Sequence, residues 1–287
     1  MKFFILLIIS VLLSLFDSIA LAQSPLVYVS DRVEKQWEVQ GNLRTPESVL
    51  FDEVNNDIYV SNINGSPLVK DGDGFISKID AKGNIVKLQW VRGLHAPKGM
   101  GIFQNHLYVT DINQLVIIDL QQEVVIDRID IPEAKFLNDI CIDKQGRVFI
   151  SDSKLRVIFC YHNGNVEKWY EGDGLSFPNG LCIHADKLYV GNYTYILEMD
   201  LKTRASSKII ENIGGGVDGI KLINNNEFLI SDWTGNVYHI DSNHKLTKLI
   251  GTAEVGINAA DFEFISKSNL LLIPTFGYNT IAGYKIN

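Results

Sequence analysis

The sequence has 287 residues, 46% of them hydrophobic, and a formal net charge of −8 from 34 acidic and 26 basic side chains. This composition is that of a globular protein and excludes disorder as the main description of the chain. The negative balance argues against a nucleic-acid-binding protein, which would carry a basic patch or stripe. Mild acidity instead suits a soluble protein and a site for a cation.

The first 22 residues have the pattern of a secretory signal peptide. Lys2 precedes an apolar run from Phe3 to Phe16, and Ala20-Leu21-Ala22 has the small-x-small form of a cleavage site. The apolar run is shorter than a membrane-spanning helix usually needs, which favours cleavage over an uncleaved anchor. We therefore expect a periplasmic or secreted protein that is free of the membrane after cleavage, with one folded domain over residues 23–287.

The mature chain contains three cysteines, an odd number that does not make a disulfide framework. Cys141 and Cys182 occupy the same place in two similar segments, NDICID and NGLCIH. Two interpretations stay open, a pair of small buried hydrophobic residues and a bridge, and the first is favoured.

One pattern recurs six times along the chain, at intervals of about 40 residues. A polar residue opens an apolar strand, a short turn follows, and a second strand ends in Asn, Asp or, in the last repeat, Thr. Two further strand-like runs complete most repeats. Repeats of four short strands predict an all-β fold, a six-bladed β-propeller with four-stranded antiparallel blades. An open solenoid and a two-sheet sandwich explain the repeat count less well.

The last repeat ends after its third strand, at Asn287, so one strand is missing. The segment KQWEVQGNLRTPES from Lys35 resembles EKWYEGDGLSFPNG from Glu167 in order and spacing. We expect residues 34–41 to pair into the last blade and close the ring, which would remove an open sheet edge.

The opening polar positions form a candidate site, because equivalent first strands of a propeller line one central channel. These positions are Glu47, Lys98, Asn138, Asn179, Asp218 and Asp261. Converging side-chain oxygens are costly to bury unless something satisfies them. Carboxylate and amide oxygens suit Ca²⁺ or another divalent cation, and the absence of Cys and His from these positions argues against zinc or copper.

Several neighbouring residues have two interpretations each. The Asn and Asp residues that end the second strands either orient the ring side chains or simply form turns, and turn formation is favoured. Lys98 either offsets the charge of Asp261 or binds an anionic part of a substrate. His95 lies in the loop that leads to Lys98 and is a weaker candidate for substrate binding. Tyr193 and Trp233 are interpreted as packing or rim aromatics.

The repeats resemble the senescence-marker-protein-30/gluconolactonase/luciferin-regenerating-enzyme family, which includes diisopropylfluorophosphatase-like enzymes. The resemblance rests on four motifs in order, TPESVLFD, LNDICID, FPNGLCI and GVDGIKL. It implies a six-bladed propeller with a catalytic calcium held by Glu47, Asn138, Asn179 and Asp218, and with Asp218 as the catalytic residue. Such enzymes hydrolyse lactones or phosphotriesters.

The chain departs from the sugar-lactone members of that family at one position. Those members carry an Arg two residues before the first ligand Asn, where this chain has Phe136. Together with Lys98, Phe136 favours a more apolar lactone or ester as the small-molecule substrate. Two alternatives stay open, a ligand- or protein-binding propeller of the NHL type and an enzyme of the strictosidine-synthase type, because a fold does not fix a function.

Overall fold

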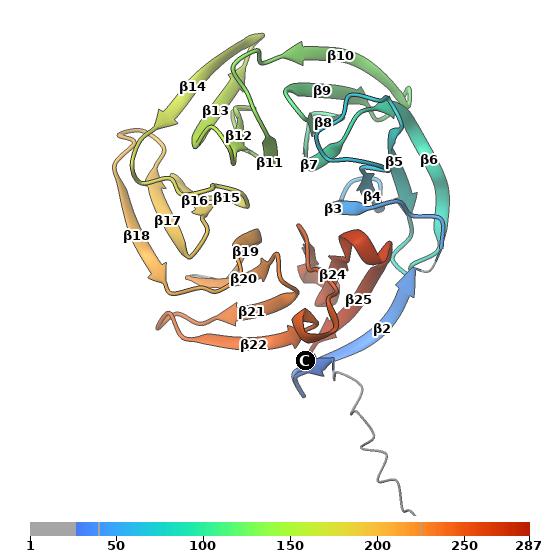
Figure 1. The fold of residues 1–287 in the computed structure, drawn as a ribbon, viewed down its shortest axis with the longest axis vertical. Helices are drawn as coiled ribbons and strands as arrows, with labels where there is room; N and C mark the ends of the chain where they lie inside the picture. The colour runs from blue at the N-terminus through green and yellow to red at the C-terminus, as the bar shows by residue number, and fades with distance from the viewer. Residues whose placement is uncertain (1–26, 40, 225) are drawn as a thin grey trace, which may run out of the picture.

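The computed structural model describes residues 27–39, 41–224 and 226–287, and the expected signal peptide lies outside these residues. The described chain forms six antiparallel sheets arranged in a ring around a central axis, with the first strand of each sheet innermost (Figure 1). This confirms the predicted six-bladed β-propeller. No helix in the described part of the chain is long and apolar enough to cross a membrane.

Blades 1 to 3 each take four consecutive strands, listed here from the axis outward. They are β3 (Pro46–Asp52), β4 (Asp57–Asn62), β5 (Gly74–Ile79) and β6 (Ile85–Leu94), then β7 (Pro97–Phe103), β8 (His106–Asp111), β9 (Gln114–Asp119) and β10 (Val124–Asp130), then β11 (Leu137–Ile142), β12 (Val148–Asp152), β13 (Val157–His162) and β14 (Asn165–Glu171).

Blades 4 and 5 follow the same order. Their strands are β15 (Leu181–His184), β16 (Lys187–Gly191), β17 (Tyr195–Asp200) and β18 (Ser206–Glu211), then β19 (Val217–Asn224), β20 (Glu227–Asp232), β21 (Asn236–Ile240) and β22 (Leu246–Gly251). Blade 5 has a fifth strand that the sequence pattern did not predict, because the two-residue β1 (Tyr28–Val29) pairs with the outer edge of β22.

Blade 6 joins the two ends of the described chain. It consists of β23 (Glu263–Ile265), β24 (Leu270–Pro274), β25 (Ile281–Ile286) and, as its outermost strand, β2 (Val33–Val39). The antiparallel pairing of β2 with β25 confirms the expected closure by an N-terminal strand. Three 3₁₀ turns, η1 (Ala253–Val255), η2 (Ser266–Ser268) and η3 (Phe276–Tyr278), lie in the connections of blades 5 and 6.

Trp37 of β2 fastens the closing blade to blade 1. Its indole N–H donates to the carbonyl oxygen of Ala81 at 3.1 Å. Its ring lies against two glycines, and a Cβ on Gly83 of blade 1 or on Gly283 of β25 would each meet the ring at 2.5 Å. The indole therefore needs both glycines, because a side chain at either position would occupy its place.

The hydrophobic core lies between blades. Six large clusters of buried side chains each combine residues of two adjacent blades, one cluster for every interface of the ring. Buried apolar area is the main favourable term in folding, so each blade depends on both of its neighbours. All three cysteines are free: Cys160 is buried in one such cluster, and the predicted bridge alternative is not realised.

The first strands approach one another closely around the axis. A Cβ on Gly99 would lie 2.5 Å from the Cα of Asp139, and a Cβ on Gly180 would lie 2.5 Å from the carbonyl oxygen of Asp218. Only glycine fits at these two positions, each directly after a polar opening position. The narrow channel that results brings the opening side chains of neighbouring blades within reach of one another.

Candidate functional site

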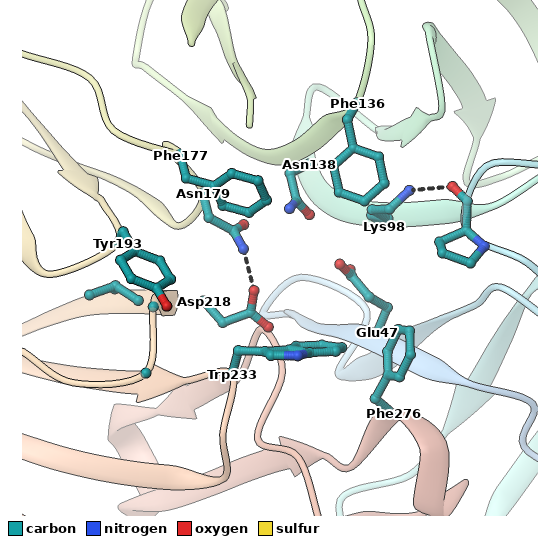
Figure 2. A pocket seen from close by; sticks show the side chains of 14 residues that line it. Glu47, Lys98, Phe136, Asn138, Phe177, Asn179, Tyr193, Asp218, Trp233 and Phe276 are labelled. Carbon is teal, nitrogen blue, oxygen red and sulfur yellow. Dashed lines mark hydrogen bonds between the residues drawn. The ribbon is translucent and has the colours of Figure 1, made fainter. Parts of the chain in front are cut away.

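Five of the six opening side chains meet at one cavity of about 310 Å³ at the end of the central channel. Its wall includes Glu47 of β3, Lys98 of β7, Asn138 of β11, Asn179 just before β15, and Asp218 of β19. Figure 2 shows the polar ends of these side chains facing a common space. Blades 1 to 5 thus contribute one polar residue each.

The Asn and Asp residues that end the second strands hold the loops leading to these positions. In four blades, the side chain accepts a hydrogen bond from the backbone N–H three residues before the opening position. The pairs are Asn62 with Arg44 (2.9 Å), Asp111 with His95 (2.9 Å), Asp152 with Lys135 (2.6 Å) and Asn192 with Ser176 (2.7 Å). These residues therefore act on the loop backbone, and none of them lines the cavity.

A hydroxyl one residue earlier fixes the other side of the opening position. Ser61, Ser151 and Ser231 each precede the last residue of a second strand. Their Oγ atoms accept the backbone N–H groups of Ser48, Asp139 and Gly219, at 2.9, 3.0 and 2.8 Å. These three N–H donors belong to the residues that directly follow Glu47, Asn138 and Asp218. The short motif at the strand end thus holds the backbone after the cavity residue, as well as the loop before it.

Glu47 and Asp218 are buried acids that share the cavity. Their side chains are 4% and 3% exposed, and Glu47 Oε2 and Asp218 Oδ2 have no hydrogen-bond partner. Burial raises the pKa of Glu47 well above its usual range, and the neighbouring Asp218 raises it further, against the opposing effect of Lys98. Burial and the charge of Asp261 raise the pKa of Asp218 to about 8. Without a cation, both acids therefore favour their protonated forms, and a cation in the cavity would favour their ionised forms.

The two amides present their oxygens to the same cavity. Asn138 Nδ2 donates to Ser153 Oγ at 3.2 Å, and Asn179 Nδ2 donates to Asp218 Oδ1. Because the nitrogens are engaged, the Oδ1 atoms of both residues are left as acceptors. Ser153 is itself fixed, since its hydroxyl donates to the carbonyl oxygen of Pro178 at 2.7 Å.

This donor set fits a hard divalent cation. Two unpartnered carboxylate oxygens and two amide oxygens are the oxygen ligands that Ca²⁺ takes, with room for further ligands. In the described part of the chain, no three His, Cys, Asp or Glu side chains gather where they could hold a metal ion. A cation in this cavity therefore depends on Asn138 and Asn179 as well as on the two acids, a donor set unlike that of zinc.

Lys98 is a buried cation at the wall of the cavity. Lys98 is only 1% exposed, and its Nζ lies 4.5 Å from the centre of the Phe136 ring. Nζ donates to the carbonyl oxygen of Ala96 at 3.2 Å and, at a long 3.5 Å, to that of Pro67. Burial lowers the pKa of Lys98, whereas Glu47 and Asp111 favour its charged form.

Two candidate residues lie apart from the cavity. Asp261 pairs with Ser48, the residue after Glu47, and accepts the Ser48 hydroxyl at 2.6 Å, so it lies one residue deeper in the channel. His95 does not line the cavity, and its Nδ1 accepts the backbone N–H of Gly72 at 3.1 Å. The charge that Lys98 faces is therefore mainly that of Glu47, in place of the expected Asp261.

Aromatic side chains form most of the remaining wall, and sequence reasoning identified only part of it. Besides Phe136, the lining aromatics are Phe177, Tyr193, Trp233 and Phe276. Phe136 and Phe177 each lie two residues before an opening position. Tyr193, Trp233 and Phe276 each follow the Asn, Asp or Thr that closes the second-strand motif of its repeat, at positions 192, 232 and 275. These two repeating positions are the signal that could have located the wall.

The sequence matches no protein-family model and no curated protein. The structure resembles a gluconolactonase from Xanthomonas campestris (15% identity, 89% of each chain covered, TM-score 0.65). It also resembles a catalytically inactive virginiamycin B lyase from Staphylococcus aureus with quinupristin (12% identity, 89% of this chain and 99% of that chain, TM-score 0.63) and a streptogramin B lyase (13%, 91% and 98%, TM-score 0.63). At these identities the similarities show that this chain shares the propeller fold of the three proteins.

Proposed function

We propose that this protein is a calcium-dependent hydrolase of an apolar lactone or a related ester, in the manner of the gluconolactonase-like propellers, and that it acts in the periplasm or after secretion. The observation that carries the proposal is the pair of buried, unpartnered oxygens, Glu47 Oε2 and Asp218 Oδ2, facing one cavity with two amide oxygens. Burying such oxygens is costly unless a cation satisfies them.

Glu47, Asn138, Asn179 and Asp218 would hold the ion, with Ca²⁺ preferred over other divalent cations by the all-oxygen donor set. When bound, the ion supplies Lewis-acid chemistry, polarising the substrate carbonyl and stabilising developing negative charge. A carboxylate beside a cation loses basicity, so a base needs an environment that restores it. In the metal-free protein, burial and Asp261 raise the pKa of Asp218 to about 8. These two effects oppose the loss of basicity, and we assign Asp218 the role of accepting the proton of the attacking water.

The aromatic wall supports an apolar substrate. The polar side chains that line the cavity, which we call the polar floor, are surrounded by five aromatic residues: Phe136, Phe177, Tyr193, Trp233 and Phe276. An apolar acyl chain or ring would bury hydrophobic area against them, while its carbonyl reached the polar groups below. A sugar-acid lactone would instead leave its hydroxyls facing aromatic rings.

The test begins with metal content. Residues 23–287 are purified, and bound metal is measured by elemental analysis beside a Glu47→Gln/Asp218→Asn variant and an Asp261→Asn control. One calcium per chain, lost in the double variant and kept in the control, is the expected result.

Activity is then measured on a panel of lactones and aryl esters. We expect turnover by the parent and a loss of at least about 100-fold in kcat for Asp218→Asn, with the melting temperature of the metal-free protein retained. A protein that binds no calcium and hydrolyses no member of the panel would overturn the proposal. Calcium binding without any turnover would favour the ligand-binding propeller.

A further inference from the structure

Lys98 is a charged side chain that lines the cavity, and the proposed hydrolysis assigns it no role. Of the Lys, Arg and His side chains in the described residues, it is the one that lines the cavity. A buried ammonium is expensive, and exposure of only 1% means that water does little to stabilise it. The site holds it in place with two backbone carbonyls and the face of Phe136.

Its hydrogen bonds leave one proton available. An ammonium has three N–H donors. Two of them point to the carbonyl oxygens of Ala96 and Pro67, and the nitrogen remains at the cavity wall, across from the Glu47 carboxylate (Figure 2). The third donor is therefore available to an atom of a bound molecule.

We propose that Lys98 is the general acid of the reaction and protonates the leaving-group oxygen of the lactone or ester. This inference rests on the proposed function. A lactone expels an alkoxide, which is a poor leaving group unless a proton reaches it as the bond breaks. Asp218 and Lys98 lie on blades 5 and 2, so the two groups approach a substrate from different sides of the ring.

The proton balance of this step is complete without a further reagent. Water attacks the acyl carbon, and its proton goes to the Asp218 carboxylate. The bond between the acyl carbon and the leaving oxygen then breaks, its electron pair stays on that oxygen, and Lys98 Nζ supplies the proton. Asp218 returns its proton to solvent, and Lys98 takes one from solvent, so the net reaction is the addition of one water molecule.

The experiment compares leaving groups in Lys98→Met, Lys98→Arg and the parent. Substrates are an alkyl lactone series and a p-nitrophenyl ester with an acyl part of the same size. A nitrophenolate leaves without a proton, so only the lactones need the acid. We expect Lys98→Met to lose about 100-fold or more in kcat on lactones and less than about 10-fold on the aryl ester. Arg keeps the charge but holds its proton too tightly to donate it, so Lys98→Arg should be as slow as Lys98→Met on lactones.

The matched control is Lys154→Met. Lys154 places its Nζ 5.3 Å from the same Phe136 ring but is exposed and does not line the cavity. It should keep parent activity on both substrates. Melting temperature and bound calcium are measured for every variant, and Lys98→Met should retain both, which separates a catalytic loss from misfolding or a lost metal.

Three results would overturn the inference. Equal losses on lactones and the aryl ester would assign Lys98 a structural or binding role, and recovery of lactone hydrolysis by Lys98→Arg would assign it a purely electrostatic one. Absence of turnover by the parent on every substrate would remove the proposed function and this inference with it, and is distinguishable because it does not depend on any variant.

Discussion

Asp152 Oδ2 accepts the backbone N–H of Phe136 at 3.1 Å, although the Asp152 side chain never reaches the cavity that Phe136 lines. The same carboxylate also accepts the N–H groups of Lys135, Lys154 and Leu155. One buried acid thus ties together two loops and fixes the approach to Asn138.

Replacing Asp152 should therefore affect both stability and the site. Asp152→Ala leaves four backbone donors without their acceptor, and we expect a loss of about 3 kcal/mol, seen as a fall of roughly 5–10 °C in melting temperature. Calcium affinity, measured by titration calorimetry, should fall at least about 10-fold because the loop before Asn138 loosens.

Asp119→Ala is the control for this variant. Asp119 accepts the N–H groups of Gln121 and Gln122 in a similar turn, but it has no bond to a cavity loop. It should cost about 1 kcal/mol and leave calcium affinity unchanged. Equal effects of the two substitutions on calcium would contradict the assignment.

The stability of the metal-free protein should fall as pH rises. In the unfolded chain an Asp ionises near pH 3.9, whereas in the fold the pKa is raised to about 6 for Asp261 and to about 8 for Asp218. The folded state therefore holds protons that the unfolded state has released, and the stabilisation present below pH 4 is lost as pH rises through 6 and 8.

Thermal melts with a chelator, from pH 5 to pH 9, measure this effect. We expect a fall of several degrees across the range, a flatter profile for Asp218→Asn, and the largest calcium-induced rise in melting temperature at the high-pH end. If the metal-free protein instead gained stability from pH 5 to pH 9, the fold would lower the pKa values of these carboxyl groups in place of raising them.

Gly283→Ala should weaken the ring closure. The new methyl group would lie 2.5 Å from the indole of Trp37, and overpacking of this kind costs about 1–3 kcal/mol. Denaturant unfolding gives the measurement. Gly277→Ala is the control, because a Cβ there meets nothing within 4 Å, and its midpoint should match that of the parent.

Trp233→Ala should change specificity more than catalysis. Trp233 lines the cavity and packs edge-on against Phe276, with ring centres 4.6 Å apart. Loss of this surface should raise KM for long-chain or ring-bearing substrates about 10-fold or more, with little change for the smallest lactone. Tyr278→Ala serves as the control, because Tyr278 is also an exposed aromatic residue and does not line the cavity.

The blades and most of the polar floor could be predicted from the sequence because both repeat. Each opening residue stands at the start of the first strand of its repeat, and a second strand that ends in Asn, Asp or Thr follows. Its place around the axis therefore follows from the repeat. Asp261 is the exception: in the last repeat it pairs with Ser48 in place of Glu47 and lies deeper in the channel. The first strand of that blade, β23, has only three residues and begins after Asp261, so the repeat position of Asp261 did not determine its depth in the channel.

The aromatic wall and the added strand β1 were harder to predict for different reasons. Phe177 and Phe276 lie in the connections between strands, and both residues have a positive φ. The direction of their side chains follows from this backbone conformation, which the alternating pattern of a strand does not predict. Strand β1 has two residues and pairs only because the edge of β22 is available. The pairing partner lies more than 200 residues away in the sequence, so no local pattern could indicate it.

The closing blade has an electrostatic consequence. Blade 6 lies between blade 1, which carries Glu47, and blade 5, which carries Asp218. The two acids therefore lie on either side of the blade in which the N-terminal strand β2 pairs with the C-terminal strand β25. Closing the ring brings the two carboxyl groups close enough to repel each other when both are ionised, as the rise that Asp218 causes in the pKa of Glu47 shows. A cation between them turns this repulsion into attraction. Ion binding at the axis and closure of the ring at its rim should then be thermodynamically linked, each lowering the cost of the other.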